Sequence, residues 1–275
     1  MSTSSPLPVV SFLSDYGTTD EFVGVCHAVM LRIAPGVRIV DITHELPPHD
    51  VRAGGLTLAR AVQYLPDGVV LGIVDPGVGT DRRAVAVEVE GGFLVGPDNG
   101  LLAPAVAMLG GARRAVELTN EEYQLPAPGP TFAGRDVFAP AAAHLVSGVP
   151  ITELGDAVDP ITLQPGLIPL TQEGDGSVHG EVLWVDRFGN VQLNVDPAEL
   201  EALGVTPGGA VQVTVKGKPR LARWVSTYGA GGESELLVVV DSYGLVSLAM
   251  PRGSAAAETG LKAADAVTVG PVEED

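Results

Sequence analysis

Short apolar runs alternate with amphipathic segments along the first part of the chain. The segments 8–17, 37–46 and 69–79 predict buried strands, because their apolar runs are nearly continuous and too short to form helices. The first strand runs into a turn and the third ends in a glycine-rich loop. Between them, residues 18–34 and 50–65 carry apolar positions at helical spacing. Strands that are apolar on both faces and separated by helices are typical of a largely parallel sheet covered by helices on both sides.

The boundaries of the first predicted helix depend on polar residues and a Pro-Gly pair. Thr18 and Thr19 precede the helical pattern together with Asp20 and Glu21, so we expect a cap and an acidic first turn there. The Pro-Gly dipeptide at 35–36 ends the helix.

The middle of the chain continues with a predicted hairpin, helices and a strand. The hairpin covers 84–100 and turns at two adjacent glycines. A helix near 101–109, a strand at 114–119 and a second helix beginning near Gly134 follow. These elements extend the α/β pattern of the first part.

The last hundred or so residues have a different pattern, with strand-like runs separated by turns and no helical period. The runs are at 180–195, 210–217, 220–228, 235–250 and 265–270. We therefore expect an α/β fold class with two domains. An amino-terminal α/β domain with a mostly parallel sheet covers 1–160, a Pro- and Gly-rich linker covers 161–176, and a smaller antiparallel β domain covers 177–275.

Polar residues gather at the predicted carboxyl ends of the strands, where ligands bind in open α/β sheets. The first strand leads into Ser-Asp-Tyr-Gly at 14–17, the second into Thr-His-Glu at 43–45, and the third into a glycine-rich loop that begins at Asp75. Arg82 follows in the same loop and can pair with Asp75. The alternative is a tight turn with a solvated arginine. The loop is not a P-loop, because no Gly-Lys-Ser/Thr follows.

Other polar residues have a structural and a functional interpretation. Asp15 either caps the helix that follows or accepts hydrogen bonds from a ribose diol. Arg135 and Asp136 either form an internal ion pair or belong to a site at a helix start. The motifs DRFGN at 186–190 and DSYG at 241–244 could be hairpin turns alone.

The acidic composition bears on which kinds of molecule the protein binds. The net charge is −18 with only 16 Lys plus Arg, which disfavours nucleic acid and anionic membrane surfaces and leaves a small-molecule substrate. No apolar run is long enough to span a membrane, and the start of the sequence lacks a basic segment followed by an apolar stretch, so we expect a cytoplasmic protein.

Cysteine and histidine usage bears on metals and redox chemistry. One cysteine, Cys26, excludes an internal disulfide framework and a multi-cysteine metal site. None of the five histidines has HExxH or similar spacing, so we expect no metal. His27 and His144 lie on apolar helical patterns and are typical of core histidines.

Seven motifs in fixed order carry a resemblance to a known family. They are SDYGTTDEFVG, DITHELPPHDVRAG, DPGVGTDRR, VGPDNGLL, TFAGRDVFAPAAAHL, DRFGN and DSYG. In order and spacing the chain resembles the S-adenosyl-L-methionine (SAM) hydroxide adenosyltransferases, relatives of the fluorinase and the chlorinase, over nearly its whole length. The resemblance implies a β-barrel-like second domain and a homotrimer with active sites between one subunit's first domain and its neighbour's second. SAM is then the substrate, and no cofactor is implied.

The resemblance also implies roles for individual residues. Asp15 would bind the ribose hydroxyls, and Asp75, Thr80, Phe132 and Gly134 would surround the ribose and the reacting carbon. From the second domain the implied substrate-binding residues are Asp186, Phe188, Asn190, Tyr228, Ser242, Tyr243 and Arg252.

A catalytic Asp, Arg and His set is implied as well, and the chain keeps only part of it. Asp75 and Arg82 match, but Ala133 stands where the family motif TFHGRD has its histidine. We expect hydrolysis of SAM to adenosine and L-methionine, slowed because alanine cannot accept a proton. The alternatives are chlorinase-like halide transfer, since that branch also lacks the imidazole, and a protein that binds SAM or adenosine without turnover.

Overall fold

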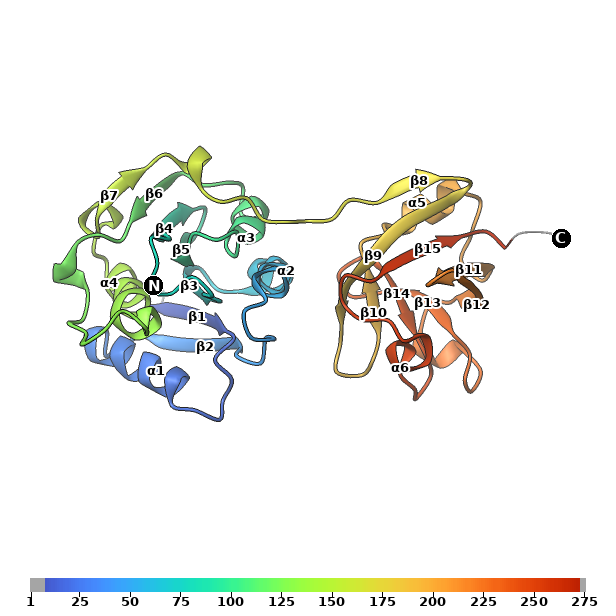
Figure 1. Ribbon diagram of the computed structural model, residues 1–275, viewed down its shortest axis with the longest axis horizontal. Helices are drawn as coiled ribbons and strands as arrows, with labels where there is room; N and C mark the ends of the chain where they lie inside the picture. Colours follow the sequence, from blue (N-terminus) through green and yellow to red (C-terminus); the bar gives the residue numbers. More distant parts are fainter. Residues whose placement is uncertain (1–7, 273–275) are drawn as a thin grey trace, which may run out of the picture. The chain divides into compact units, whose positions relative to one another are not determined.

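The computed structural model describes residues 8–272 and confirms the predicted fold class (Figure 1). The chain divides into two compact units, Met1–Ile168 and Pro169–Asp275. The division falls inside the segment predicted as a linker. The start of that segment is still bound to the first unit, because the Arg83 guanidinium donates to the Thr162 carbonyl and the Gln164 amide donates to Asp98 at 2.8 Å.

The first unit is built on a seven-stranded sheet with the order β2-β1-β3-β5-β4-β6-β7. Strands β2, β1, β3 and β5 are parallel to one another, whereas β4, β6 and β7 pair antiparallel. The strands are β1 (Val9–Ser14), β2 (Arg38–Thr43), β3 (Gly68–Ile73), β4 (Ala84–Val89), β5 (Gly92–Pro97), β6 (Arg114–Glu117) and β7 (Asp156–Val158). The predicted hairpin is the pair β4 and β5.

Helices cover both faces of this sheet (Figure 1). They are α1 (Phe22–Ile33), α2 (Val51–Ala61), α3 (Ala103–Met108) and α4 (Ala139–Val146). Successive residues of β1 point to opposite faces: Phe12 packs in the core formed with α1 and α4, and Leu13 packs in the core formed with α2 and α3. The near-continuous apolar character of β1 follows from this two-sided burial.

The beginning of α1 differs from the prediction. The helix starts after Glu21, which has helical dihedrals and makes no side-chain cap, and no acidic residue lies in its first turn. Thr18 instead donates its hydroxyl hydrogen to Glu45 at 2.9 Å. The prediction was wrong because the helix begins only at Phe22, after the acidic residues, and Thr18 bonds to the loop after β2 rather than to the helix terminus.

Short helical turns complete the first unit. A π-helical turn, Gly134–Phe138, runs directly into α4, at the place where the sequence predicts a helix beginning near Gly134. The 3-10 turns of the unit are Val62–Tyr64, Glu121–Tyr123, Ile151–Glu153 and Pro160–Thr162.

The second unit is a closed barrel. Its sheet has the order β10-β14-β13-β12-β11-β15-β9-β8, and an additional pairing of β9 with β10 closes seven of these strands into a ring. The strands are β8 (Gln172–Gly174), β9 (Ser177–Val185), β10 (Val191–Leu193), β11 (Ala210–Val215), β12 (Lys218–Trp224), β13 (Leu237–Val240), β14 (Val246–Ala249) and β15 (Ala266–Gly270). Alternate residues of these strands fill the interior, among them Val182, Val213, Val238 and Leu248.

One pairing in the barrel departs from the antiparallel prediction. Strand β12 pairs parallel to β13, with Arg223 opposite Leu237. The chain between them includes the 3-10 turn Tyr228–Ala230 and returns beside the last two residues of β12, so that β13 continues in the same direction. The sequence pattern of alternating apolar residues is the same for both pairings, so it did not distinguish them.

Two short helices of the second unit were not predicted: α5 (Pro197–Ala202) and α6 (Ala255–Thr259). Each begins with a side-chain cap, from Asp196 and Ser254 respectively. Among residues 8–272, no helix is long and apolar enough to cross a membrane.

Candidate functional site

Two carboxylates lie at the carboxyl edge of the parallel strands. Asp15 directly follows β1, and Asp75 follows β3 after Val74. Because β1 and β3 are neighbours, with the Asp15 amide donating to the Ile73 carbonyl at 3.3 Å, the two acidic residues share one edge of the sheet. The structure therefore brings together Asp15 and Asp75, which are 60 positions apart in the sequence (75 − 15 = 60).

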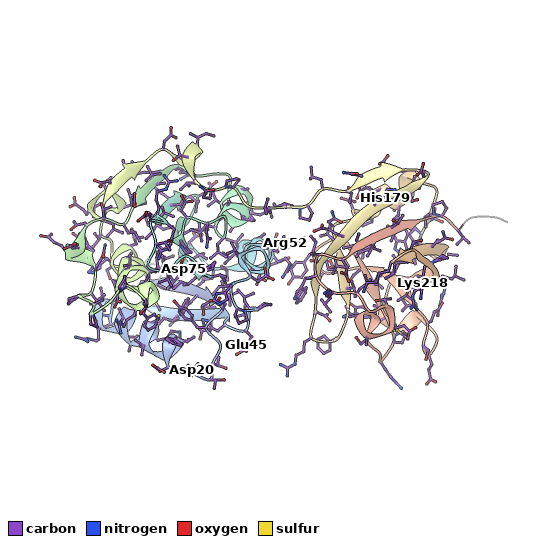
Figure 2. The ribbon with its side chains drawn as sticks, viewed as in Figure 1. Asp20, Glu45, Arg52, Asp75, His179 and Lys218 are labelled. Carbon is purple, nitrogen blue, oxygen red and sulfur yellow. The ribbon has the colours of Figure 1, made fainter. Side chains whose placement is uncertain are left out.

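Asp75 and Arg82 form a two-pronged ion pair. Arg82 Nε donates to Asp75 Oδ1 at 2.9 Å, and Nη2 donates to Oδ2 at 2.7 Å. Both side chains are largely buried, at 7% and 16% exposure, and the guanidinium also lies over the Phe138 ring at 5.1 Å. The solvated-arginine alternative is wrong for Arg82, whose fork is fixed by the carboxylate. Figure 2 labels Asp75 within the first unit.

The loop between Asp75 and Arg82 is held by its own polar groups. Thr80 donates its hydroxyl hydrogen to the Gly77 carbonyl at 2.7 Å and accepts from the Arg82 amide at 3.4 Å. Gly79 has φ +78°, a conformation that favours glycine. The loop thus presents Thr80 on its exposed side while Arg82 points back to the strand end.

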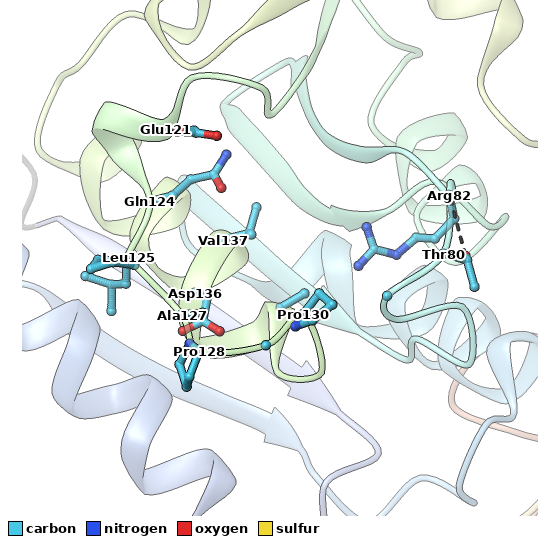
Figure 3. Close-up of a pocket in the computed structure, with 14 residues that line it drawn as sticks. Thr80, Arg82, Glu121, Gln124, Leu125, Ala127, Pro128, Pro130, Asp136 and Val137 are labelled. Atoms are coloured by element: carbon cyan, nitrogen blue, oxygen red, sulfur yellow. Dashed lines mark hydrogen bonds between the residues drawn. The ribbon is translucent and has the colours of Figure 1, made fainter.

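A cavity of about 820 Å³ opens beside this loop. Its wall includes Thr80 and Arg82 on one side and Ala133, Asp136 and Val137 on the other. Figure 3 shows the Arg82 side chain extending into the space that faces the π-helical turn. Ala133, where the resemblance predicts a histidine in relatives, therefore lies on the wall of the same cavity as the arginine of the Asp–Arg pair.

Gly134 is required by a close approach of Tyr16. A Cβ at position 134 would lie 2.3 Å from the Tyr16 hydroxyl oxygen and 3.1 Å from its Cζ. The Tyr16 ring in turn meets Phe132 edge-on, with centroids 5.8 Å apart, and Phe22 at 5.6 Å. Packing within the protein is thus sufficient reason for glycine here, and the substrate contact predicted for Gly134 stays a prediction.

Tyr16 is a residue that sequence reasoning missed. Burial raises the pKa of its hydroxyl above the ordinary value, with further increases from the nearby Cys26, Asp15 and Asp75. It stands among the carboxylates of the strand edge and the aromatic residues around Phe132. Its position directly after Asp15 at a strand end was the available signal.

Asp15 does not cap a helix. Its Oδ2 accepts from the backbone amide of His49 at 2.8 Å, and His49 has φ +68°, a left-handed conformation that is rare outside glycine. The carboxylate thereby fixes the loop after β2. The cap alternative is wrong, and the predicted ribose contact is untested.

The pair Arg135 and Asp136 follows the structural interpretation. Arg135 Nε donates to Asp136 Oδ1 at 2.6 Å, and the guanidinium lies 5.2 Å from the Phe132 ring centre. Asp136 is 5% exposed. This ion pair lies in the first residues of the π-helical turn, next to Ala133 on the cavity wall.

In the second unit, the motif DRFGN forms a turn around Asp186. Its Oδ1 accepts from the amides of Phe188 and Asn190 at 2.9 and 2.8 Å, and its Oδ2 accepts from the Asn190 side chain at 2.7 Å. The Phe188 side chain is 79% exposed. The hairpin-turn interpretation is confirmed, and the turn presents a large aromatic surface to its surroundings.

The motif DSYG forms a second turn of the same kind. Asp241 Oδ1 accepts from the Tyr243 amide at 2.8 Å, and Ser242 and Tyr243 are exposed. Burial, followed by the charges of Asp186 and Asp241, raises the pKa of the Tyr228 hydroxyl above its ordinary value. The two turns and Tyr228 contain six of the seven substrate residues predicted for the second unit.

Arg252 is the last of the predicted residues. It is exposed and has φ +54°. This left-handed conformation, uncommon for a residue with a side chain, sits in the turn between β14 and α6.

Comparisons with known proteins match both units of the chain to the same family. The family described as SAM hydroxide adenosyltransferase N-terminal domain matches residues 10–155, and the C-terminal domain of the same family matches residues 180–268. An (R)-S-adenosyl-L-methionine hydrolase of Salinispora tropica is 47% identical over 266 residues, 96% of this chain and 98% of that protein. A fluorinase of an Actinoplanes species is 30% identical over 291 residues, 95% of this chain and 97% of its own. The crystal structure of an uncharacterized conserved protein from Thermotoga maritima matches with a TM-score of 0.88 and 35% identity, covering 95% of this chain and 99% of that one.

Proposed function

Because the chain belongs to the SAM hydroxide adenosyltransferase family, we propose that it hydrolyses SAM to adenosine and L-methionine. The observation that carries the proposal is the forked Asp75–Arg82 pair at the carboxyl edge of the sheet, whose Arg82 lines a cavity. Relatives named as hydrolases are 47% and 44% identical to this chain, whereas a fluorinase is 30% identical. Water is therefore favoured over halide as the nucleophile.

The proposed reaction is a substitution at the ribose 5′ carbon. The water oxygen forms a bond to that carbon while the carbon–sulfur bond breaks, and the bonding electrons stay on sulfur as a neutral thioether. The leaving group needs no proton, so the site must mainly hold water in line with the breaking bond. The proton lost by the attacking water passes to solvent. Arg82 would orient the water, and Asp75 would hold the guanidinium in place.

We further propose that Ala133 slows this reaction. The family histidine would supply an imidazole on the cavity wall opposite Arg82, and Ala133 offers only a methyl group there. A general base or orienting group of this kind contributes about 10²- to 10⁴-fold in rate. The chain then binds its substrate and turns it over slowly.

The names of the close relatives suggest the stereochemistry of the substrate. They specify the R configuration at the sulfonium centre. We extend that preference to this chain as part of the proposal. An in-line attack requires a fixed direction of the carbon–sulfur bond, so the two sulfonium configurations would place the methionine part in different positions.

We also propose a homotrimer in which Asp15, Thr80, Phe132 and Gly134 of one subunit bind the ribose. The neighbour's second unit would then supply its substrate residues: Asp186, Phe188, Asn190, Tyr228, Ser242, Tyr243 and Arg252. The exposed Phe188 and Tyr243 side chains support this, because large exposed aromatic residues are enriched at binding surfaces. A cytoplasmic location belongs to the same proposal.

The test is product analysis with a matched variant. The purified chain and its Ala133→His variant are incubated with the R and S forms of SAM, with and without chloride, and the nucleosides are separated by chromatography. We expect adenosine from both proteins, faster with the variant by about 10²- to 10⁴-fold and faster with the R form.

Three outcomes would contradict parts of the proposal. Release of 5′-chloro-5′-deoxyadenosine in chloride would establish halide transfer. Bound SAM with no product from either protein would establish a binding protein. Equal rates for the chain and Ala133→His would remove the role given to the missing imidazole.

A further inference from the structure

Three side chains with metal-ligating atoms meet outside the site described above. His27 comes from α1, Asp41 from β2, and His44 from the loop after β2. His27 Nε2 lies 2.9 Å and His44 Nε2 lies 3.0 Å from the same oxygen, Asp41 Oδ1. The ligand atoms of all three residues are within 4.8 Å of one another.

We propose that His27, Asp41 and His44 bind a divalent transition-metal ion of the zinc class. Two imidazole nitrogens and one carboxylate oxygen are a donor set that suits zinc, nickel, copper or iron, whereas magnesium and calcium prefer oxygen ligands alone. The proposal departs from the expectation of no metal. That expectation used spacing along the chain, and these residues are brought together by a helix, a strand and a loop.

The triad is held in place from the buried side. His44 has 4% side-chain exposure, and its Nδ1 lies 2.7 Å from the Ser14 hydroxyl oxygen. The Phe12 ring meets His44 edge-on, with centroids 4.6 Å apart. A metal-binding imidazole usually has its other nitrogen hydrogen-bonded in this way, which fixes its orientation before the ion arrives.

The open side of the triad faces solvent. Asp41 is 45% exposed and His27 is 27% exposed, so an ion can enter. Three protein ligands leave a fourth position for water in a tetrahedral zinc site. A carboxylate oxygen only accepts hydrogen bonds, so in the metal-free triad the Nε2 atoms of both histidines donate to Asp41 and carry the protons. When the ion binds, it replaces these two protons, which move to the Nδ1 atoms or to water.

The proposed metal site is linked by hydrogen bonds to the end of β1, next to Asp15 of the candidate functional site. Ser14, the partner of His44, also accepts from the Tyr16 amide at 3.3 Å and directly precedes Asp15. A bound ion would therefore stiffen the segment from Ser14 to Tyr16. The binding itself does not depend on the proposed hydrolysis.

The test is titration of metal-free protein with Co²⁺, followed by visible absorption, with Zn²⁺ as competitor. The variants are His27→Gln and Asp41→Asn, which change exposed or half-exposed side chains. The matched control is His179→Gln, because His179 lies on β9 in the second unit (Figure 2). We expect one Co²⁺ per chain with the intense absorption of a tetrahedral complex, displaced by Zn²⁺.

Each triad variant should lower the affinity for Co²⁺ at least about 100-fold, and Ser14→Ala about 10- to 100-fold, as for outer partners of metal ligands. The control should bind as the parent does. A thermal unfolding measurement distinguishes loss of the metal site from failure of a variant to fold. Zn²⁺ should raise the unfolding temperature of the parent and of His179→Gln, but not that of a folded Asp41→Asn variant. Absence of Co²⁺ binding to the parent at millimolar metal, or unchanged binding in the triad variants, would leave a metal-free hydrogen-bonded triad and overturn the proposal.

Discussion

Replacing Gly134 by alanine tests whether the Tyr16 contact sets the shape of the site. The added Cβ would lie 2.3 Å from the Tyr16 hydroxyl oxygen and 3.1 and 3.2 Å from two carbons of its ring. Since ordinary contacts lie near 3.5 Å, the hydroxyl would have to move by about 1 Å. Phe132 and Phe22 border the ring at 5.8 and 5.6 Å between centroids, so the movement disturbs the aromatic group as a whole.

We expect Gly134→Ala to lower the free energy of unfolding of the first unit by about 1–3 kcal/mol, the range for overpacked cores. Urea unfolding followed by circular dichroism measures this loss, because the longer helices belong to the first unit. Both tryptophans, Trp184 and Trp224, lie in the second unit, so their fluorescence serves as an internal control that should not change.

The double variant with Tyr16→Phe identifies the cause. Removing the hydroxyl removes the 2.3 Å contact and leaves only the two milder ones. We expect a coupling energy of about 0.5–3 kcal/mol between positions 16 and 134, measured against each single variant. The reasoning is refuted if Gly134→Ala stays within about 0.5 kcal/mol of the parent, or if Tyr16→Phe does not relieve its effect.

Three further predictions concern charges and the thiol. Asp75→Ala leaves Arg82 buried without its partner and should lower the free energy of unfolding, measured in urea, by about 3–5 kcal/mol. The product assay should show loss of adenosine release. A free energy of unfolding and a release rate near those of the parent would contradict this prediction. Burial raises the pKa of Cys26 to about 12, so a thiol reagent at pH 8 should modify it only after unfolding, the native thiolate fraction being about 10⁻⁴; rapid modification of native protein would refute it. A hydrogen bond from Arg223 lowers the pKa of Glu235 from 4.5 to about 2, so its contribution to stability is present above pH 4.5 and lost as the pH falls through 2. Glu235→Gln should therefore be less stable than the parent at pH 7 and equal to it below pH 2 in denaturant unfolding; a difference that persists at the lowest pH would argue against the pair.

Local patterns predicted most elements of the first unit because β1, β3, β4 and β5 are buried along most of their length. The apolar runs around Phe12 and Leu71 predicted buried strands, and both residues are fully buried. β2 formed where the sequence predicts a strand, but the expected burial was wrong: β2 lies at the edge of the sheet and has no buried residue. β7 was missed because it is a three-residue edge strand with two exposed residues, which carries almost no apolar signal.

The candidate site was predictable where its residues are close in sequence. Asp75 and Arg82 belong to one loop, and their fork follows from that loop closing on itself. The contact of Tyr16 with Gly134 joins residues 118 positions apart (134 − 16 = 118), and only the packing of α1 and α4 on the same face brings them together. The His27, Asp41 and His44 triad was invisible to spacing rules for the same reason.

The Ala133 side chain faces the cavity, whereas its neighbours in the sequence are packed inside the protein. Its side chain lines an open cavity, while its neighbours Gly134 and Asp136 are fixed by Tyr16 and Arg135. A residue at such a position can be exchanged for a larger one without repacking the interior, since the cavity has room for the added atoms. If the proposed reaction takes place in this cavity, position 133 is the place to introduce side chains that orient nucleophiles other than water.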